Sequence, residues 1–472
     1  MRALSKACLV VAVLGGCSVS VPTLLPPPFG PADPPDAPRL FFPTGLAAAP
    51  SGWLLVNNGN FDRGFDSGAM LSISPDFIAQ QYAGDPAVVM TTAALPAEAD
   101  PKHPLRAVML ASFAGPIAFD QSGTVAYTAS RASNTVTAVQ LDPATGELSC
   151  AVRGGKDCRT GLVNLLTTAA LEGPYGVAAG FARLPGDTAD HPVMFVSSLV
   201  PHIESITNTQ LSAFGRVAAL QTDAVGQLLY TLVASSPTIA NQIGAGPILF
   251  DGSRRQLILG GCYQRFGASS SGDPTTAKCT LQSGVNPLRF VNVDSGVNAN
   301  VRVFDLAPAV RGNETTGLAL GGEDASGVPQ VLYAVSRNPD VMVELLLPPL
   351  QGQDPIIRRV TTLPLSPSGA LRLRRPAGQS GPDLIAVAGS NNSTISIYDS
   401  FQGQVVALLP ASVVPGVTGD YPFALAQLDS SPDQARARFA VTIFGSCQLA
   451  FYDVSFATPT DARLRSVVGA CP

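Results

Sequence analysis

Residues 114–142 read AGPIAFDQSGTVAYTASRASNTVTAVQLD and combine short apolar segments with polar turns. Within this stretch, Thr135-Val136-Thr137-Ala138-Val139 alternates polar and apolar side chains, which is the pattern of a half-buried β-strand. Gly, Asp, Ser and Asn occupy the positions between the apolar segments and favour tight turns. The stretch therefore predicts short antiparallel strands joined by turns.

The same pattern recurs along the chain. Seven copies are recognisable, and they lie at residues 41–76, 114–142, 173–222, 246–306, 316–348, 368–399 and 421–455. A fourth strand per copy is expected in segments such as 227–233, 358–363 and 404–409. Four strands in each of seven units predict an all-β protein, a seven-bladed β-propeller with four-stranded antiparallel blades. Long loops are expected at 82–105, 145–170 and 263–287.

Composition agrees with strands that are packed on both faces. The chain has 472 residues, of which 45 are Gly and 41 are Pro, and charged residues make up only 13%. The net charge of −5 gives no electrostatic footprint for nucleic acid, so we expect no nucleic-acid partner. A hydrophobic content of 46% excludes a disordered chain.

The second and sixth copies resemble the YVTN-type and lactonase-like seven-bladed propellers, whose motif runs approximately GPxGVAVSPDG followed by YVANSxSNTVSVID. The resemblance covers residues 40–456. It implies one propeller domain over residues 40–472 and offers lactone hydrolysis as an alternative function. It lies in strand motifs and matches no catalytic residues, so it implies no active site.

The N-terminus has the layout of an export signal. Arg2 and Lys6 precede a short apolar segment, which is followed by Leu14-Gly15-Gly16-Cys17. This end resembles the bacterial lipobox, from which it departs by having Gly as the second residue. The resemblance implies a signal peptide over residues 1–16 and a lipidated Cys17. A secreted protein with a chance cysteine at this position is the alternative.

A proline-rich segment follows the expected lipidation site. Residues 18–39 read SVSVPTLLPPPFGPADPPDAPR, which favours extended polyproline II structure. With Cys17 it forms an expected tether, residues 17–39, about 20 residues long and able to span roughly 60 Å. We expect the protein to be lipid-anchored in the bacterial cell envelope, at the outer membrane, facing the periplasm or the cell surface.

Six cysteines remain after Cys8 and Cys17 are assigned to the signal peptide and the lipid. An even number in an exported chain favours disulfides. Pairing between sequence neighbours is the most economical arrangement, and other connectivities stay open. The neighbouring pairs are Cys150–Cys158, Cys262–Cys279 and Cys447–Cys471.

In a propeller, the loops that precede the innermost strands converge on one face with the turns between the second and third strands, and this face is the expected ligand site. The repeats place polar and aromatic residues from six blades there. The candidate residues are Asn57, Asn60, Asp62, Arg131, Asn134, Tyr175, His202, Glu204, Arg337, Asp340, Asn391 and Tyr421.

Two sets of residues in these loops could take part in metal binding or catalysis. Asn60, Asp62 and Asp66 could supply oxygen ligands to Ca²⁺, although a turn stabilised by its own Asn and Asp side chains is the favoured interpretation. His202 and Glu204 share one side of an extended segment and could form a general base with its orienting carboxylate. An exposed loop pair without a catalytic role is the favoured alternative there.

We expect a non-catalytic binding platform, acting as a monomer with no cofactor. Its unknown partner would be a protein, peptide or glycan. A lactonase-like hydrolase, with Ca²⁺ as an optional cofactor, is the alternative. The two differ in the channel: several inward carboxylates would favour an enzyme, whereas small apolar residues with an aromatic face would favour binding. The first-strand residues, such as Leu46-Ala47-Ala48 and Leu318-Ala319, are small and apolar.

Overall fold

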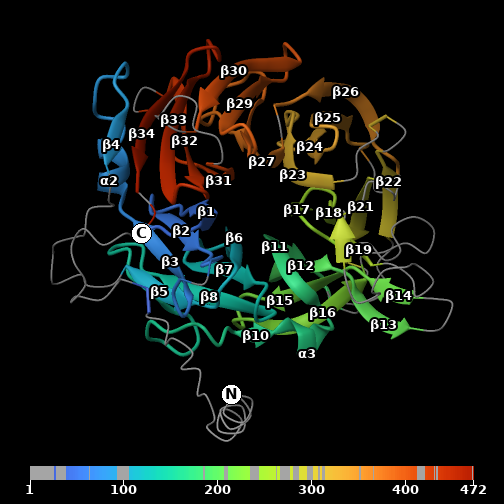
Figure 1. Cartoon of the computed structure of the whole chain (residues 1–472). Helices are drawn as coiled ribbons and strands as arrows, with labels where there is room; N and C mark the ends of the chain where they lie inside the picture. The colour runs from blue at the N-terminus through green and yellow to red at the C-terminus, as the bar shows by residue number, and fades with distance from the viewer. Residues whose placement is uncertain are drawn as a thin grey trace, which may run out of the picture.

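The chain folds into a ring of seven blades around a central channel (Figure 1). The computed structural model describes residues 26–27, 39–62, 64–92, 106–183, 187–206, 211–233, 244–261, 263–265, 277–279, 286–294, 301–306, 309–310, 314–349, 352–364, 366–411, 420–429, 431, 434–469 and 471. The predicted seven-bladed propeller of antiparallel four-stranded blades is confirmed. The expected signal peptide, Cys17 and most of the expected tether lie outside the described residues.

The first four blades follow the chain in order. Blade one contains β1 (Pro43–Ala48), β2 (Leu54–Asn58), β3 (Gly68–Ile73) and β5 (Ala107–Leu110). Blade two contains β6 (Ala114–Phe119), β7 (Val125–Ser130) and β8 (Thr135–Leu141), with β9 (Leu148–Cys150) and β10 (Val163–Asn164) both paired to β8. Blade three contains β11 (Glu172–Ala182), β12 (His191–Val200), β15 (Arg216–Gln221) and β16 (Gln227–Val233). Blade four contains β17 (Ile248–Asp251), β18 (Gln256–Leu259), β21 (Pro287–Asn292) and β22 (Val301–Asp305).

The last three blades complete the ring. Blade five contains β23 (Glu314–Gly321), β24 (Val331–Arg337), β25 (Val341–Leu346) and β26 (Ile356–Thr362). Blade six contains β27 (Pro367–Leu373), β28 (Leu384–Gly389), β29 (Thr394–Asp399) and β30 (Gln404–Pro410). Blade seven contains β31 (Pro422–Gln427), β32 (Arg436–Ile443), β33 (Gln448–Ser455) and β34 (Ala462–Val468), with β4 (Met90–Thr92) added at its outer edge.

A few elements lie outside this plan. The short helices α2 (Pro75–Gln80) and α3 (Leu165–Ala169) follow β3 and β10. Two hairpins, β13 (His202–Ile206) with β14 (Leu211–Phe214) and β19 (Tyr263–Arg265) with β20 (Ala277–Cys279), project from blades three and four. The segment 145–170, expected as a loop, therefore holds β9, β10 and α3.

The core lies between neighbouring blades, because the strands are apolar on both faces. One cluster joins Leu384 and Ile397 of blade six to Phe439 and Tyr452 of blade seven, all of them fully buried. Hydroxyl groups on the innermost strands add polar links between blades. Thr44 donates to the carbonyl of Ala114 at 2.6 Å, and Ser368 donates to the carbonyl of Pro422 at 2.8 Å. Such bonds satisfy carbonyl groups that the ladder leaves free at the channel wall.

Among the described residues, no strand from the part of the chain before β1 joins blade seven. Leu464–Val468 belongs to β34, which pairs with β33. Arg39–Phe42 is irregular up to the start of β1. Instead β4, from the segment between β3 and β5 of blade one, pairs in parallel with β34 (Figure 1).

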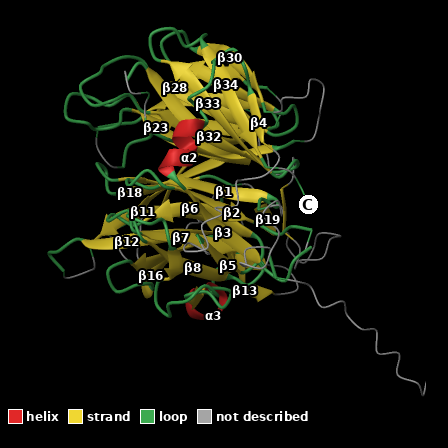
Figure 2. Ribbon diagram, turned by 90° about the vertical axis from the view of Figure 1, so that its left-hand side faces the viewer, coloured by secondary structure: helices red, strands yellow, loops and turns green. Residues whose placement is uncertain are grey.

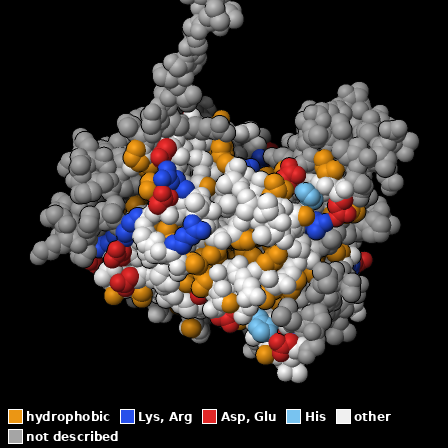
Figure 3. All heavy atoms as spheres, turned by 90° about the horizontal axis from the view of Figure 1, so that it is seen from below, with side chains coloured by type: hydrophobic (Ala, Val, Ile, Leu, Met, Phe, Trp, Pro, Cys, Tyr) orange, Lys and Arg blue, Asp and Glu red, His pale blue; other side chains and the backbone are white. Residues whose placement is uncertain are grey.

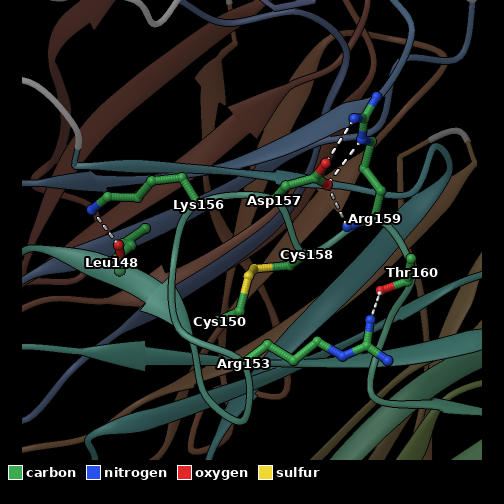
Figure 4. Close-up of a disulfide and its surroundings, with 8 residues drawn as sticks. All are labelled: Leu148, Cys150, Arg153, Lys156, Asp157, Cys158, Arg159 and Thr160. Atoms are coloured by element: carbon green, nitrogen blue, oxygen red, sulfur yellow. Dashed lines mark hydrogen bonds and ion pairs between the residues drawn. A yellow bond between two sulfur atoms is a disulfide. The ribbon is translucent and has the colours of Figure 1, made fainter.

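Two of the three expected disulfides are present. Cys150–Cys158 closes a loop after β9, and Cys447–Cys471 ties the C-terminal segment to the turn between β32 and β33. Figure 4 shows the first disulfide among the side chains of Arg153, Lys156 and Arg159. Cys262–Cys279 lies outside the described side chains. Disulfides are typical of exported proteins and so support the expected export.

The side view shows stacked blades and the two small helices, and none of the described helices is long and apolar enough to cross a membrane (Figure 2). One edge of the disc is mostly uncharged, and its few basic side chains lie near acidic ones (Figure 3).

Candidate functional site

The innermost strands all begin on one face of the ring, and aromatic side chains gather there. Phe61 contacts Phe113 with ring centroids 4.6 Å apart and Phe444 with centroids 5.1 Å apart. Phe444 in turn contacts Phe42 at 5.1 Å and Phe423 at 6.3 Å. We call this face the aromatic mouth, and define it as Phe42, Phe61, Phe113, Arg131, Tyr175, Tyr421, Phe423 and Phe444 from blades seven, one, two and three.

Arg131 extends the aromatic mouth toward blade three. Its guanidinium carbon lies 5.7 Å from the ring centroid of Phe61 and 5.8 Å from that of Tyr175. A cation between two ring faces is attracted by both and stays partly solvated. Tyr421, whose carbonyl accepts a hydrogen bond from Phe444 N, is the most open aromatic residue of the mouth, with 43% of its surface exposed.

Three aromatic residues of this mouth have left-handed backbone conformations. The φ angles of Phe42, Phe113 and Tyr421 are 49°, 61° and 46°, and each residue directly precedes an innermost strand. This conformation costs a residue with a Cβ atom about 1–2 kcal/mol. Ser366, which directly precedes the innermost strand of blade six, has the same conformation with a φ of 53°, so this backbone geometry is a feature of the repeat.

The structure brings together three of the residues predicted for the ligand face, Arg131, Tyr175 and Tyr421, in the aromatic mouth. Asn134 lies beside them and is committed to the fold, because its side-chain oxygen accepts a hydrogen bond from Gly173 N at 2.8 Å. Asn57 is fully buried, and its amide donates to the carbonyl of Gly115 in the next blade at 2.7 Å.

The three oxygen-bearing residues considered for Ca²⁺ serve the turn between β2 and β3. Asn60 is buried, and its side chain bonds both the N–H and the carbonyl of Phe65. Asp62 accepts a hydrogen bond from Gly64 N at 3.0 Å, and Asp66 forms an ion pair with Arg159 at 2.9 Å. Within the described residues, no group of three or more His, Cys, Asp or Glu side chains could hold a metal ion.

The other predicted residues lie on the same face but apart from the aromatic mouth. His202 faces Glu172 across 3.9 Å, while Glu204 pairs with Arg216. Arg337 donates to the carbonyl of Pro367 at 2.8 Å and lies 3.8 Å from Glu314, whose pKa is raised by burial against the opposing effect of Arg337. Asp340 follows in the turn between β24 and β25, and Asn391 is exposed in the turn between β28 and β29.

A second candidate site lies at the opposite end, where the innermost strands of blades four to seven finish. A cavity of about 580 Å³ opens there. Its walls include the half-buried apolar side chains of Leu249, Leu320 and Leu371. Its polar lining is Arg372, Arg374, Arg375, Gln427 and Asp429. We call it the arginine cavity; it is a wide hollow that is open to solvent.

The three arginines of this cavity differ in their partners. Arg372 pairs with Asp383 at 2.7 Å and with Glu323 at 2.6 Å; burial opposes its charge, but these partners raise its pKa overall. Arg375 lies over the ring of Phe456 at 4.8 Å and donates to the carbonyls of Pro382 and Phe456. Burial lowers the pKa of Arg375.

The sequence predicts Arg131, Tyr175 and Tyr421 of the mouth, but not its phenylalanines or the arginine cavity, and the reason is physical. The aromatic residues of the mouth are far apart in sequence and meet only because blades seven and one are joined. In the sequence, Arg374 and Arg375 form only an isolated basic pair. The available signal was their position, directly after the innermost strand of blade six.

Fold and sites together define a seven-bladed β-propeller with two differently lined channel ends. No family model matches the chain, and no curated protein matches it. It is similar in structure to hydrazine synthase from Kuenenia stuttgartiensis, with a TM-score of 0.50 and 11% identity over 89% of this chain and 97% of that one. Sqt1 from Saccharomyces cerevisiae has a TM-score of 0.45 and 11% identity, over 92% and 87% of the two chains. A periplasmic gluconolactonase from Pseudomonas aeruginosa has a TM-score of 0.41 and 16% identity, over 78% and 84%. At these identities the likeness concerns the fold alone.

Proposed function

We propose that the protein is a lipid-anchored propeller of the bacterial cell envelope that binds a partner at its aromatic mouth. The observation that supports this proposal most strongly is the set of contacting rings of Phe42, Phe61, Phe113, Phe423 and Phe444, beside the more exposed Tyr421. Aromatic residues and Arg are also the side chains that dominate protein-binding hot spots.

The side chains along the channel wall favour a binding role over a catalytic one. Its innermost strands present small or apolar side chains, among them Ala47, Ala118 and Ala370, all partly exposed. The lipid anchor rests on the lipobox resemblance at Cys17, and the disulfides agree with an exported protein.

In-cell photo-crosslinking tests the partner site. A benzophenone amino acid replaces Tyr421, and the matched control replaces Phe401, an aromatic residue in the turn between β29 and β30 with 82% of its surface exposed. We expect a discrete crosslinked species from position 421 and none of that size from position 401. No species from position 421, or the same species from both, would contradict the proposal.

Labelling with radioactive palmitate tests the anchor separately. We expect the full chain to incorporate label and Cys17→Ala to lose it. Label retained by Cys17→Ala would overturn the lipid assignment without affecting the aromatic mouth.

A further inference from the structure

The outermost strand of a propeller blade has one side without a partner strand, and most blades of this protein protect that side. Proteins cover such an edge, charge it or keep it short, because its free N–H and C=O groups can pair with another chain. In blade seven, β4 pairs with the outer side of β34. In blade one, Met109 of β5 donates through its N–H to the carbonyl of Lys156 at 2.8 Å and accepts from Cys158 N at 2.9 Å. In blade two, the outermost strands β9 and β10 have only three and two residues.

Blades three to five protect their outer strands by charge or by packing. β22 of blade four carries Arg302 and Asp305, and β26 of blade five carries Arg358 and Arg359. Charged side chains on an edge strand disfavour pairing with another strand. β16 of blade three has no charged residue, but α3 lies beside it and none of its described apolar side chains is exposed.

The outer strand of blade six, β30, has none of these protections. It is the last strand of its sheet and lies at the outer rim of the ring, and none of the described strands pairs with its outer side (Figure 1). Its sequence, QVVALLP, contains no charged residue. Gln404 is exposed, and 59% of the surface of Leu408 is exposed. β30 is therefore an open, uncharged strand edge that is ready to pair with another strand.

An apolar hollow adjoins this edge. It has a volume of about 530 Å³ and lies between residues 405–408 of β30 and residues 362–364 at the end of blade five. Thr362 is its only lining residue with a polar side chain. A strand added to β30 would place its side chains beside this apolar surface, where their burial is favourable.

We propose that two copies of the protein pair through β30, antiparallel and across a two-fold axis perpendicular to the sheet. Such an axis keeps the same face of the sheet on the same side, so Leu408 of each copy lies on the face that holds both hollows. Self-pairing of β30 brings no like charges together, whereas self-pairing of β26 would bring arginines close to arginines. The pairing uses the open edge of both copies, so the assembly stops at a dimer.

This dimer has a consequence for the aromatic mouth. β30 runs toward the face of the ring that carries the mouth, and the paired strands run in opposite directions. The mouths of the two copies therefore open on opposite sides of the dimer, and each can be occupied separately. The dimer takes the place of the monomer expected from the sequence, and it does not depend on what the mouth binds.

Analytical ultracentrifugation tests the pairing. The protein is the full chain from residue 17 carrying Cys17→Ser, which removes any lipid and keeps every described residue. Over about a hundredfold dilution series, we expect dimers at high concentration, monomers at low concentration and no larger species. Monomers at every concentration, or a series of larger oligomers, would overturn the proposal.

A substitution in β30 tests the position of the contact. Leu408→Lys weakens dimer formation about tenfold, because the symmetry places the lost apolar contact and the added charge in both copies. The matched control is Val152→Lys in the disulfide loop of blade two, where 59% of the valine surface is exposed, as for Leu408. The control should dimerise like the unsubstituted chain. Equal dimerisation of the two variants would overturn the proposal, and melting temperatures of dilute samples show whether both fold.

Hydrogen exchange of the unsubstituted chain gives a test that needs no variant. The amides of β30 should exchange more slowly at high protein concentration than at low concentration, since pairing covers this edge. Those of β16 and β26 should exchange at the same rate at both concentrations. Protection of another outer strand in place of β30 would show that the copies meet elsewhere and would refute the assignment.

Discussion

At the scale of single residues, the contact between Trp53 and Gly146 shows how tightly neighbouring blades pack. Trp53, the only tryptophan of the chain, is buried beside blade two, where its indole donates to the carbonyl of Pro143 at 3.1 Å. Gly146 has a φ of 73°, and an added Cβ would lie 2.2 Å from the indole ring. Glycine is therefore required there both for its conformation and for its size.

We predict that Gly146→Ala lowers the free energy of unfolding by about 3 kcal/mol, combining left-handed strain with overpacking. The matched control is Gly154→Ala, whose φ is 65° and whose added Cβ would meet nothing within 4 Å. The control should lose only about 1 kcal/mol, since strain alone remains. Urea unfolding followed by Trp53 fluorescence measures both losses, and equal losses would show that the indole contact has no energetic weight.

At the scale of elements, the segment after β3 crosses from blade one to blade seven. Ser74 caps α2, with Pro75 at its start and Asp76 in the first turn, a combination that sets the helix start. Tyr82 follows in a buried position, where its hydroxyl donates to the carbonyls of Phe439 and Tyr452. Arg465 of β34 donates to the carbonyls of Tyr82 and Gly84, both at 2.9 Å.

We predict that Tyr82→Ala destabilises the protein by about 3–5 kcal/mol, because a buried aromatic ring and its hydrogen bonds are lost. Tyr82→Phe keeps the ring and should lose about 1 kcal/mol. Hydrogen exchange would show faster exchange in β4 and β34 for the alanine variant. Unchanged exchange in these two strands would mean that the segment does not hold the two blades together.

The strands of each blade could be predicted from the sequence, and this crossing segment could not. Period-2 alternation and turn residues are local signals, so a strand is predicted at Thr135–Val139, and β8 is observed at Thr135–Leu141. The pairing of β4 with β34 joins residues near 91 to residues near 467, and three residues carry no pattern that specifies such a partner. The same holds for the candidate sites: Tyr175 and Tyr421 were predicted from their place in the repeat. Phe61 and Phe444 belong to the mouth only because the ring is closed.

At the scale of the whole molecule, β4 is one link between blades one and seven, and packing between the blades adds others. β1 packs beside β31, and Leu40 joins a buried cluster with Leu449 and Val468. The disulfide Cys447–Cys471 lies at this junction and closes a segment with a sequence separation of 24 residues. In the chain-entropy description, a loop of this length stabilises the folded state by about 3 kcal/mol.

We predict that Cys471→Ser loosens blade seven before the other blades. Native-state hydrogen exchange should show a loss of about 3 kcal/mol in the opening free energy of β33 and β34, with blades three to five little changed. The control is the double substitution Cys150→Ser and Cys158→Ser, which removes a disulfide with a sequence separation of 8 in blade two and should leave β34 protected. Equal loss in every blade of Cys471→Ser would mean that the ring opens as one cooperative unit. In that case the junction between blades one and seven would be no weaker than any other contact in the ring.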